Sequence, residues 1–465
     1  MWVYIIKCLS FIFLINLFIT YSSLGQNINQ ALSLAYSNHP LLFAERAAGR
    51  AASENVTEAL SGWRPEVHLD SSIGKKLVTS KLNGGSANTK NNTPITVGVN
   101  VTQNIYDAGQ REEALKIAES EVLLAHAELM KIENDVLLES AFAYLDLVKE
   151  QLLLKIALKN LQVVERQLEA TKDRFEVGDV TITDVSQAEA RLADALANKV
   201  RAESDLESAK ASYFSAVGKE AKEILFPEIV PPFPANIQEL KEKSSSQNPT
   251  VVTSIHREKV AKNKLNLARK ELGPSIDLRA SVNQSWDPNT FFEEQRYLDL
   301  TATLNWPLYR GGKEWSKIRK LREKVTQATA EKDHSIRVAN KKALQLWSRI
   351  ERSKAQIIAY KSSVHANEVA LEGVIEEEYV GARTVIDVLD AENELFRAKA
   401  NLIKTERDLY IYIYSLVAVV GDLNARQLNL PVAVFYNPEE YYNKVRNSWG
   451  GIEGERNSFF DVLKN

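Results

Sequence analysis

Cysteine is almost absent from this chain of 465 residues, and its only example, Cys8, lies in an apolar segment near the N-terminus. Lys7 precedes the apolar run 9–19, and small residues follow at 23 and 25, which is the pattern of a secretory signal peptide. We expect cleavage after residue 25, so that Gln26 starts a mature chain without disulfides, reactive thiolates or cysteine-based metal sites. A membrane anchor is disfavoured because the run is short, and a lipoprotein because Cys8 does not follow the cleavage site.

Long apolar runs and an excess of one charge are also missing. No stretch of the mature chain supplies the about 18 consecutive apolar residues that a transmembrane helix needs, so we expect no such helix. Lys and Arg total 58 against 61 for Asp and Glu, which gives no reason to expect nucleic acid as a partner. The histidines lack the spacing of metal ligands, and no phosphate loop or nucleophile elbow occurs. We therefore expect neither an enzyme nor a cofactor or metal site.

What the chain does contain is an internal repeat. The matching landmarks are His39-Pro40 with Asn248-Pro249, Pro65 with Pro274, Tyr106 with Tyr309, Val177-Gly178 with Val380-Gly381, Asp184 with Asp387, and Gly218 with Gly421. Their offset decreases once, inside the Gly-, Asn-, Thr- and Ser-rich segment 82–94, where an exposed loop tolerates extra residues. We predict a first repeat at 26–225, a Pro-rich linker at 226–235, a second repeat at 236–424, and an irregular aromatic tail at 425–465 that packs around the outside.

Each repeat contains two stretches in which apolar and polar residues alternate, the pattern of strands with one apolar face. The strands are predicted near 67–73, 95–101, 276–282 and 298–304, and aromatic residues stand at several of their ends. At roughly 9–12 residues each, such strands are long enough to cross a bilayer when tilted. The alternative is the edge of a soluble β-sandwich. Four strands cannot close a barrel alone, so the membrane interpretation requires several chains.

Long helices are predicted between the strand pairs. From Leu115 the apolar positions recur at alternating spacings of three and four, and the second copy keeps this register from Ile318. Such spacing is typical of a coiled-coil seam, and a helix from Gly109 to about Phe175 would be roughly 100 Å long. Many seam positions are alanine, which allows helices to approach closely. A plain structural coiled coil is the alternative explanation.

Two segments resemble the TolC family of outer-membrane efflux and secretion proteins. The first comprises residues 174–178 (RFEVG) and 181–185 (TITDV), and the second, which is more specific, comprises residues 379–391 (YVGARTVIDVLDA). The resemblance extends from about residue 27 to 421. The tail around 430–449 is similar to the branch of the family that serves type I protein secretion.

The resemblance implies a mixed α+β homotrimer in the cell outer membrane. Four strands from each chain would close a twelve-stranded β-barrel in outer-membrane lipid, and the helices would continue it as a periplasmic tunnel. The implied partners are a periplasmic membrane-fusion adaptor and an inner-membrane exporter, of the ABC type or another. Type I protein secretion is the favoured function, and a small-molecule efflux duct is the first alternative. A secreted coiled-coil scaffold without a pore is the alternative from a different class.

The resemblance also identifies a periplasmic gate. Asp387 and Asp390 share one face of a helix, and although such a pair is usually solvated surface, threefold symmetry would stack its copies into two acidic, cation-selective rings. Divalent cations bound there would be inhibitors and not cofactors. Arg383 is expected to bond Thr183 and Asp184 of the other helical hairpin, where the alternative is an ordinary surface ion pair worth about 0–1 kcal/mol.

The two hairpin tips are the expected adaptor contacts by the same resemblance, although tight turns alone would explain their glycines. Their residues are Val177, Gly178 and Asp179 in the first repeat and Val380, Gly381 and Ala382 in the second. The sequence departs from the family pattern at two places. Glu378 stands where an aromatic residue often assists the gate, and Asp179 replaces a residue that is usually apolar.

Overall fold

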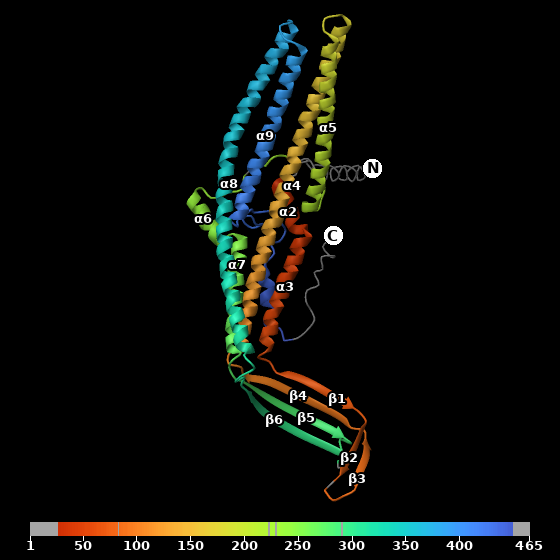
Figure 1. Cartoon of the computed structure of the whole chain (residues 1–465), viewed down its shortest axis with the longest axis vertical. Coiled ribbons are helices and arrows are strands. Elements are labelled where there is room, and N and C mark those ends of the chain that lie inside the picture. Colours follow the sequence, from red (N-terminus) through yellow and green to blue (C-terminus); the bar gives the residue numbers. More distant parts are fainter. Residues whose placement is uncertain (1–26, 82, 222–223, 228–229, 290–291, 450–465) are drawn as a thin grey trace, which may run out of the picture. The chain divides into compact units, whose positions relative to one another are not determined.

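The structure, a computed structural model, describes residues 27–449 except 82, 222–223, 228–229 and 290–291 (Figure 1). The predicted signal peptide lies outside the described residues. In chain order the elements are α2 (Ile28–Asn38), α3 (Pro40–Ser61), β1 (Glu66–Ile73), β2 (Lys76–Lys81), β3 (Ala87–Asn92), β4 (Ile95–Tyr106), α4 (Gln110–Glu176), α5 (Ile182–Val217), α6 (Ile237–Ser246), α7 (Pro249–Lys270), β5 (Ser275–Trp286), β6 (Glu294–Asn305), α8 (Lys313–Tyr379), α9 (Val385–Val419) and α10 (Pro438–Val445).

This order is one series of elements used twice. Two helices lead into strands, and the strands are followed by a 67-residue helix, α4 or α8, and then by α5 or α9. The predicted long helix is confirmed, because α4 begins and ends within one residue of the expected bounds. Pro40 and Pro249 each open a helix, α3 and α7, where a missing N–H costs nothing.

Two compact units divide the chain. The helical unit consists of the described residues up to Phe43, Met130–Pro249 and Arg337–Phe435. The sheet unit consists of Ala44–Leu129, Thr250–Ile336 and the described residues from Tyr436. No helix among the described residues combines the length and the apolar character that a membrane-spanning helix needs.

The sheet unit contains a four-stranded antiparallel sheet in the order β1-β4-β5-β6, which confirms the four predicted strands (Figure 1). The central pair, β4 with β5, joins the two repeats. Its register sets apolar residues side by side on one face, as in the row Leu69, Val99, Val282 and Leu298. This face is exposed, with Leu69 at 72% and Leu298 at 78% of their full accessibility. The chain itself therefore leaves an extensive apolar surface uncovered.

The exposed loop expected at 82–94 is more ordered than the sequence indicated. Strands β2 and β3 pair over six positions and form a separate two-stranded sheet. Gly84, with φ of +80°, lies in the turn between them, and the Thr79 and Thr89 hydroxyls bond each other at 3.0 Å across the pair. The first-repeat insertion is thus a hairpin of its own.

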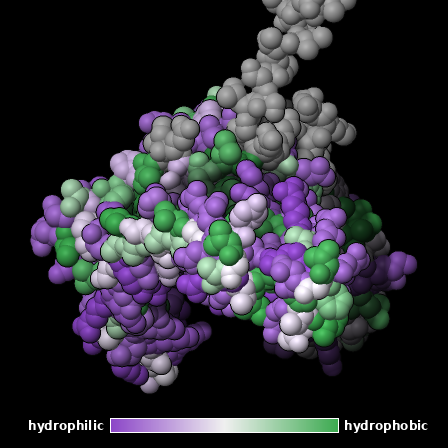
Figure 2. Space-filling model, turned by 90° about the horizontal axis from the view of Figure 1, so that it is seen from above, coloured by the Kyte–Doolittle hydropathy of each residue, from purple (hydrophilic) through white to green (hydrophobic). Residues whose placement is uncertain are grey.

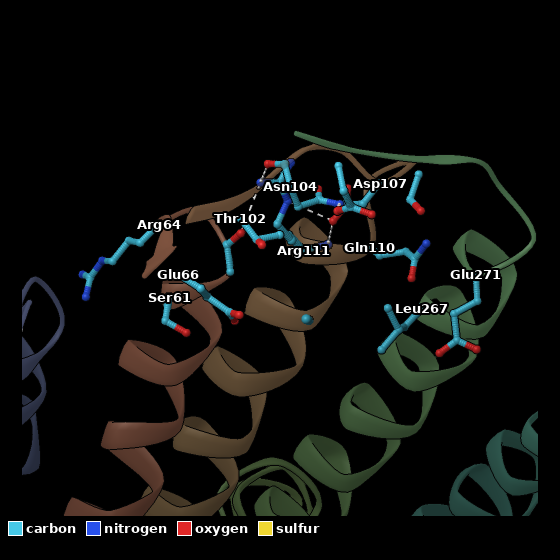
Figure 3. Close-up of a pocket in the computed structure, with 14 residues that line it drawn as sticks. Ser61, Arg64, Glu66, Thr102, Asn104, Asp107, Gln110, Arg111, Leu267 and Glu271 are labelled. Atoms are coloured by element: carbon cyan, nitrogen blue, oxygen red, sulfur yellow. Dashed lines mark hydrogen bonds and ion pairs between the residues drawn. The ribbon is translucent and has the colours of Figure 1, made fainter. Parts of the chain in front are cut away.

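Where β4 ends and α4 begins, hydrogen bonds of Arg111 connect the two elements (Figure 3). Its Nε donates to Asp107 Oδ2 at 2.9 Å, and its guanidinium also donates to the carbonyls of Asn104 and Gly62. A cavity of about 570 Å³ opens beside this junction. Asp107 in turn accepts from the backbone N–H groups of Gly109 and Arg111, so the strand-to-helix turn is held by one ion pair.

In the helical unit, two tyrosines hold the start of the Pro-rich linker. The Tyr144 hydroxyl donates to the Leu225 carbonyl at 2.7 Å, and the Tyr410 hydroxyl donates to the Pro227 carbonyl at 2.8 Å. Phe226 stacks on the Tyr410 ring, with 5.7 Å between ring centroids. Burial raises the pKa of Tyr144 to about 12, so its hydroxyl remains a donor at physiological pH.

The tail differs from the irregular segment that the sequence predicted, because part of it forms α10. Within the sheet unit this helix packs on α3. The Thr57 hydroxyl donates to the Val445 carbonyl at 2.9 Å, Tyr441 bonds Glu54 at 2.7 Å, and the Arg64 guanidinium lies 4.5 Å from the centre of the Trp449 ring. Pro438 at the first turn and the Asn437 cap explain why a helix starts here.

The glycines that follow α5 and α9 differ in how closely other parts of the chain pack against them, and substitution of each tests this difference. Both Gly218 (φ +79°) and Gly421 (φ +83°) are left-handed, but only at Gly421 would a Cβ lie 2.2 Å from a backbone oxygen, that of Gln247. We expect Gly218→Ala to cost about 1–2 kcal/mol for the backbone strain alone. Gly421→Ala should cost about 2–5 kcal/mol, because overpacking is added. Equal losses in thermal unfolding would contradict this packing.

Candidate gate at the helical hairpin tips

The two helical hairpins of the helical unit end in the same turn. In the first, Gly178 takes a φ of +82° and its N–H donates to the Phe175 carbonyl at 3.0 Å, while the Asp179 N–H donates to Arg174 at 2.9 Å. Gly381 repeats this pattern in the second hairpin, with bonds of 2.9 and 2.8 Å to the matching carbonyls. This is the Schellman motif, which requires a left-handed residue at the position after the helix. Glycine is therefore fixed at both tips by the turn itself.

Two of the predicted gate aspartates close capping boxes. Asp184 accepts from the backbone N–H of Thr181 at 2.8 Å at the start of α5, and Asp387 accepts from the N–H of Thr384 at 2.8 Å at the start of α9. The threonine hydroxyls donate to the same carboxylates at 2.7 and 2.8 Å. These bonds lower the pKa of both aspartates. Because the folded pKa lies below the unfolded one, the stabilisation is present above about pH 4 and is lost as pH falls through the lowered pKa.

Ion pairs link the first hairpin to the second. Arg191 of α5 places Nη2 2.5 Å from Oδ1 of Asp390 on α9. Arg174 at the end of α4 binds both Asp179 of its own tip, at 2.7 Å, and Glu378 of α8. The hydrogen bond that Arg174 donates to the Asp179 carboxylate is the main cause that raises the pKa of Arg174. We call these two links, Arg174–Glu378 and Arg191–Asp390, the cross-hairpin pairs.

An apolar seam lies beside the cross-hairpin pairs. Val385 and Leu389 of α9 belong to one buried cluster with Ala188 of α5 and Leu161 and Leu168 of α4. Ala188 has no exposed surface, so its small side chain lets α5 and α9 approach closely. Asp387 and Asp390 lie on a different face of α9, which is less buried than the face of Val385 and Leu389. The seam supplies burial energy, whereas exposed ion pairs contribute only about 0–1 kcal/mol each.

Arg383 does not bond the first hairpin in this structure. Its Nε donates to Glu377 Oε2 at 2.8 Å, within the same hairpin, and that bond is the leading cause that raises its pKa. Thr183 is exposed on the first turn of α5, and Asp184 is bonded to its own cap. The predicted contact of Arg383 with Thr183 and Asp184 is therefore not made here, because nearer partners satisfy both charged groups.

The sequence interpretation missed the two arginines of the cross-hairpin pairs and misjudged Glu378. A signal was available in the repeat, because Arg174 corresponds to Glu377 and Arg191 to Glu394 in the second copy. At both positions the charge has changed sign between the copies. Glu378, which the sequence analysis described only as a departure from the family pattern, is the partner of Arg174.

The predicted adaptor-contact residues lie at the ends of the tips. Val177 is 80% exposed and Val380 is 74% exposed, and Tyr379 beside it is 86% exposed. Figure 2 views the molecule from the end at which the tips lie, and hydrophobic side chains there are interspersed with hydrophilic ones. Gly178, Gly381 and Ala382 are exposed as well. No group of three or more His, Cys, Asp or Glu that could hold a metal ion occurs among the described residues.

Comparison with known proteins fits this arrangement of duplicated hairpins. The model of the outer membrane efflux protein family matches residues 31–219 and again residues 240–422, one match for each repeat. The chain belongs to this family. It is accordingly a TolC-type outer-membrane efflux protein, as the motifs at both tips predicted.

Curated relatives cover most of the chain. Outer membrane efflux protein BepC of Brucella suis is 29% identical over 93% of this chain and 93% of its own length. Outer membrane protein TolC of Vibrio cholerae is 27% identical over 87% of this chain and 92% of its own. Proteases secretion protein PrtF of Dickeya chrysanthemi is 25% identical over 64% and 66%, respectively.

Solved structures show the same fold. The Campylobacter jejuni CmeC outer membrane channel aligns with a TM-score of 0.78 over 91% of this chain and 90% of its own, at 12% identity. At that identity the likeness concerns the fold. The duplicated series of helices and strands is thus the architecture of known outer-membrane channels.

The cross-hairpin pair Arg191–Asp390 can be tested by a charge swap. We expect Arg191→Ala to increase hydrogen exchange at the tips roughly two- to fivefold, because an exposed pair contributes about 0.2–1 kcal/mol to closure. The double variant Arg191→Asp with Asp390→Arg should restore most of the protection. Arg397→Ala is the matched control, because Arg397 pairs only with Glu394 of its own helix in the described contacts. Equal exchange in all three variants would contradict a link between hairpins.

Proposed function

We propose that this chain is the outer-membrane duct of a tripartite export system and works as a homotrimer. A periplasmic membrane-fusion adaptor and an inner-membrane exporter, of the ABC type or another, would complete the system. The main support for this proposal is that a chain of the outer membrane efflux family has two equivalent helical hairpins joined by the cross-hairpin pairs. Energy would come from the exporter, because the duct itself needs no catalytic group.

The exposed surface of the sheet unit supports the proposed trimer. Strands β1 and β6 are the edges of the four-stranded sheet, and unpaired edges invite pairing with other chains. The apolar face is exposed along the sheet, while the opposite face carries polar residues such as Asn100, Ser281 and Asp299. A closed twelve-stranded barrel would place the first face in lipid and the second in the lumen.

The proposed gate lies at the hairpin tips. In the trimer, Asp387 and Asp390 would form the two acidic rings, and Arg191 would neutralise part of the Asp390 ring while the hairpins stay together. Parting of the cross-hairpin pairs would widen the aperture and uncover Asp390. The exposed tips, Val177 and Val380 among them, would receive the adaptor.

The cargo is proposed to be protein, exported by type I secretion. The aromatic tail supports this choice, because its sequence is similar to that branch of the family, and one relative is named a proteases secretion protein. Small-molecule efflux is the second candidate, and it is favoured by the relative named an efflux protein. A deletion strain separates them: loss of secreted proteins with unchanged drug tolerance supports secretion, and the reverse outcome supports efflux.

Conductance of the purified protein in a planar bilayer tests the proposed pore. We expect a cation-selective conductance that rises severalfold when Asp387→Ala is combined with Asp390→Ala, because the rings and the link to Arg191 are lost together. Selectivity for cations should fall in the same variant. Glu323→Ala with Asp333→Ala, two exposed acids of α8, is the charge-matched control. A monomeric product that never conducts would refute the proposal.

A further inference from the structure

We propose that the hairpin of β2 and β3 binds the phosphate groups of anionic lipid headgroups in the outer leaflet of the outer membrane. We call it the basic hairpin and define it by the described residues 74–81 and 83–94. The inference rests on the proposed function, because it requires the apolar face of the sheet to lie in lipid.

The basic hairpin carries charge of only one sign. It contains Lys75, Lys76, Lys81 and Lys90, and no Asp or Glu occurs between Asp70 and Asp107. The corresponding turn of the second repeat, residues 287–294, has three acids and no lysine. The basic hairpin is thus a part of the first repeat in which positive charge is concentrated, whereas the matching turn of the second repeat is acidic.

Three of these lysines are available for a ligand. Lys90 Nζ lies 3.8 Å from Asp287 Oδ1 and is partly neutralised by it. Lys75, Lys76 and Lys81 are exposed, and no carboxylate among the described residues lies within 4.0 Å of their ammonium groups. Their charge is therefore directed to solvent or to a partner outside this chain.

The basic hairpin is held in place at its base. Asn92 is fully buried, and its Nδ2 donates to Asp287 Oδ1 and to the Asn289 carbonyl, both at 2.7 Å. Asp287 also accepts from the Thr93 N–H at 2.5 Å, in a backbone conformation with φ of +47°. These bonds connect the hairpin to the β5–β6 turn. The lysines are thus presented from an ordered element that keeps a fixed position relative to the sheet.

The lysines at the base follow directly on the apolar face. Ile73, Ile95 and Trp286 lie side by side in the last paired row of this face. Trp286 supplies an aromatic ring there, and tryptophan is typical of the membrane–water interface. Lys75 and Lys76 come two and three positions after Ile73, which is about 7–10 Å further along an extended chain. Long lysine stems reach from there to the headgroups while the ammonium stays in water. This juxtaposition favours lipid phosphates over a soluble polyanion.

Native mass spectrometry of the full-length protein in detergent tests the inference, with diphosphorylated lipid A and the same lipid without phosphates as probes. We expect the wild type to bind the phosphorylated probe more tightly, and Lys75→Gln, Lys76→Gln and Lys81→Gln together to weaken that binding on the order of tenfold to a hundredfold. The charge-matched control is Lys320→Gln, Lys341→Gln and Lys404→Gln, exposed lysines of α8 and α9, and should bind like the wild type.

Equal binding of both probes by the wild type, or unchanged binding by the lysine variant, would overturn the inference. Full competition by inorganic phosphate would assign the site to free phosphate and would overturn it as well. The variant must keep the oligomeric state and conductance of the wild type, which excludes misfolding as the cause. A wild type that never conducts refutes the proposed pore by a separate measurement, so the two failures are distinguishable.

Discussion

Pairing of β4 with β5 is the constraint on which the rest of the sheet unit depends. These strands come from different repeats, and their antiparallel register runs from Ile95 against Trp286 to Tyr106 against Ile276. It aligns the apolar residues of both copies on one face, because a slip by one residue would send them to opposite faces. It also leaves β1 and β6 as edges. One chain therefore leaves backbone N–H and C=O groups unpaired at both edges of this sheet, which is a physical reason to expect further copies.

Charge has diverged between the repeats where the two hairpins meet, whereas the turns have not. Both tips keep glycine at the left-handed position and a Thr–Asp capping box, since the turn geometry requires them. Arg174 and Arg191, by contrast, have acids at the matching positions of the second copy. Two identical hairpins would repel each other or pair without preference. Arg174 and Arg191 instead attract Glu378 and Asp390 of the second hairpin, at positions that are uncharged in the first copy.

The sequence predicted most of the fold because its signals are local and repeated. Alternation located the four main strands, and the spacing of apolar residues from Leu115 located α4. It did not predict β2 and β3, because the segment from Lys76 to Asn92 is mostly polar and its base is held by Asp287, which lies far away in the chain. Nor did it predict α10, whose helix is stabilised by contacts with α3.

The contacts at the proposed gate were predicted only in part, for a physical reason. Motif resemblance located Asp387 and Asp390, but it could not indicate the partners, since an ion pair depends on which side chains are within about 4 Å in space. Arg383 illustrates the difficulty. It forms its ion pair with Glu377, six positions away in the same hairpin, and not with a residue of the other hairpin. Arg174 binds Glu378 of α8 although it also binds Asp179, five positions away in its own hairpin.

Asp387 and Asp390 consequently differ in what they can contribute to a gate. Asp387 is bound to Thr384 by two hydrogen bonds, which hold its carboxylate ionised and directed at its own helix start. Asp390 is bound only through Arg191 among the described contacts, so the proposed parting of the hairpins would release it. In the proposed trimer, a fixed charge and a releasable charge one helical turn apart would give the aperture a constant acidic ring and a second ring whose charge depends on closure. The closed and open states would then differ in electrostatic potential as well as in width.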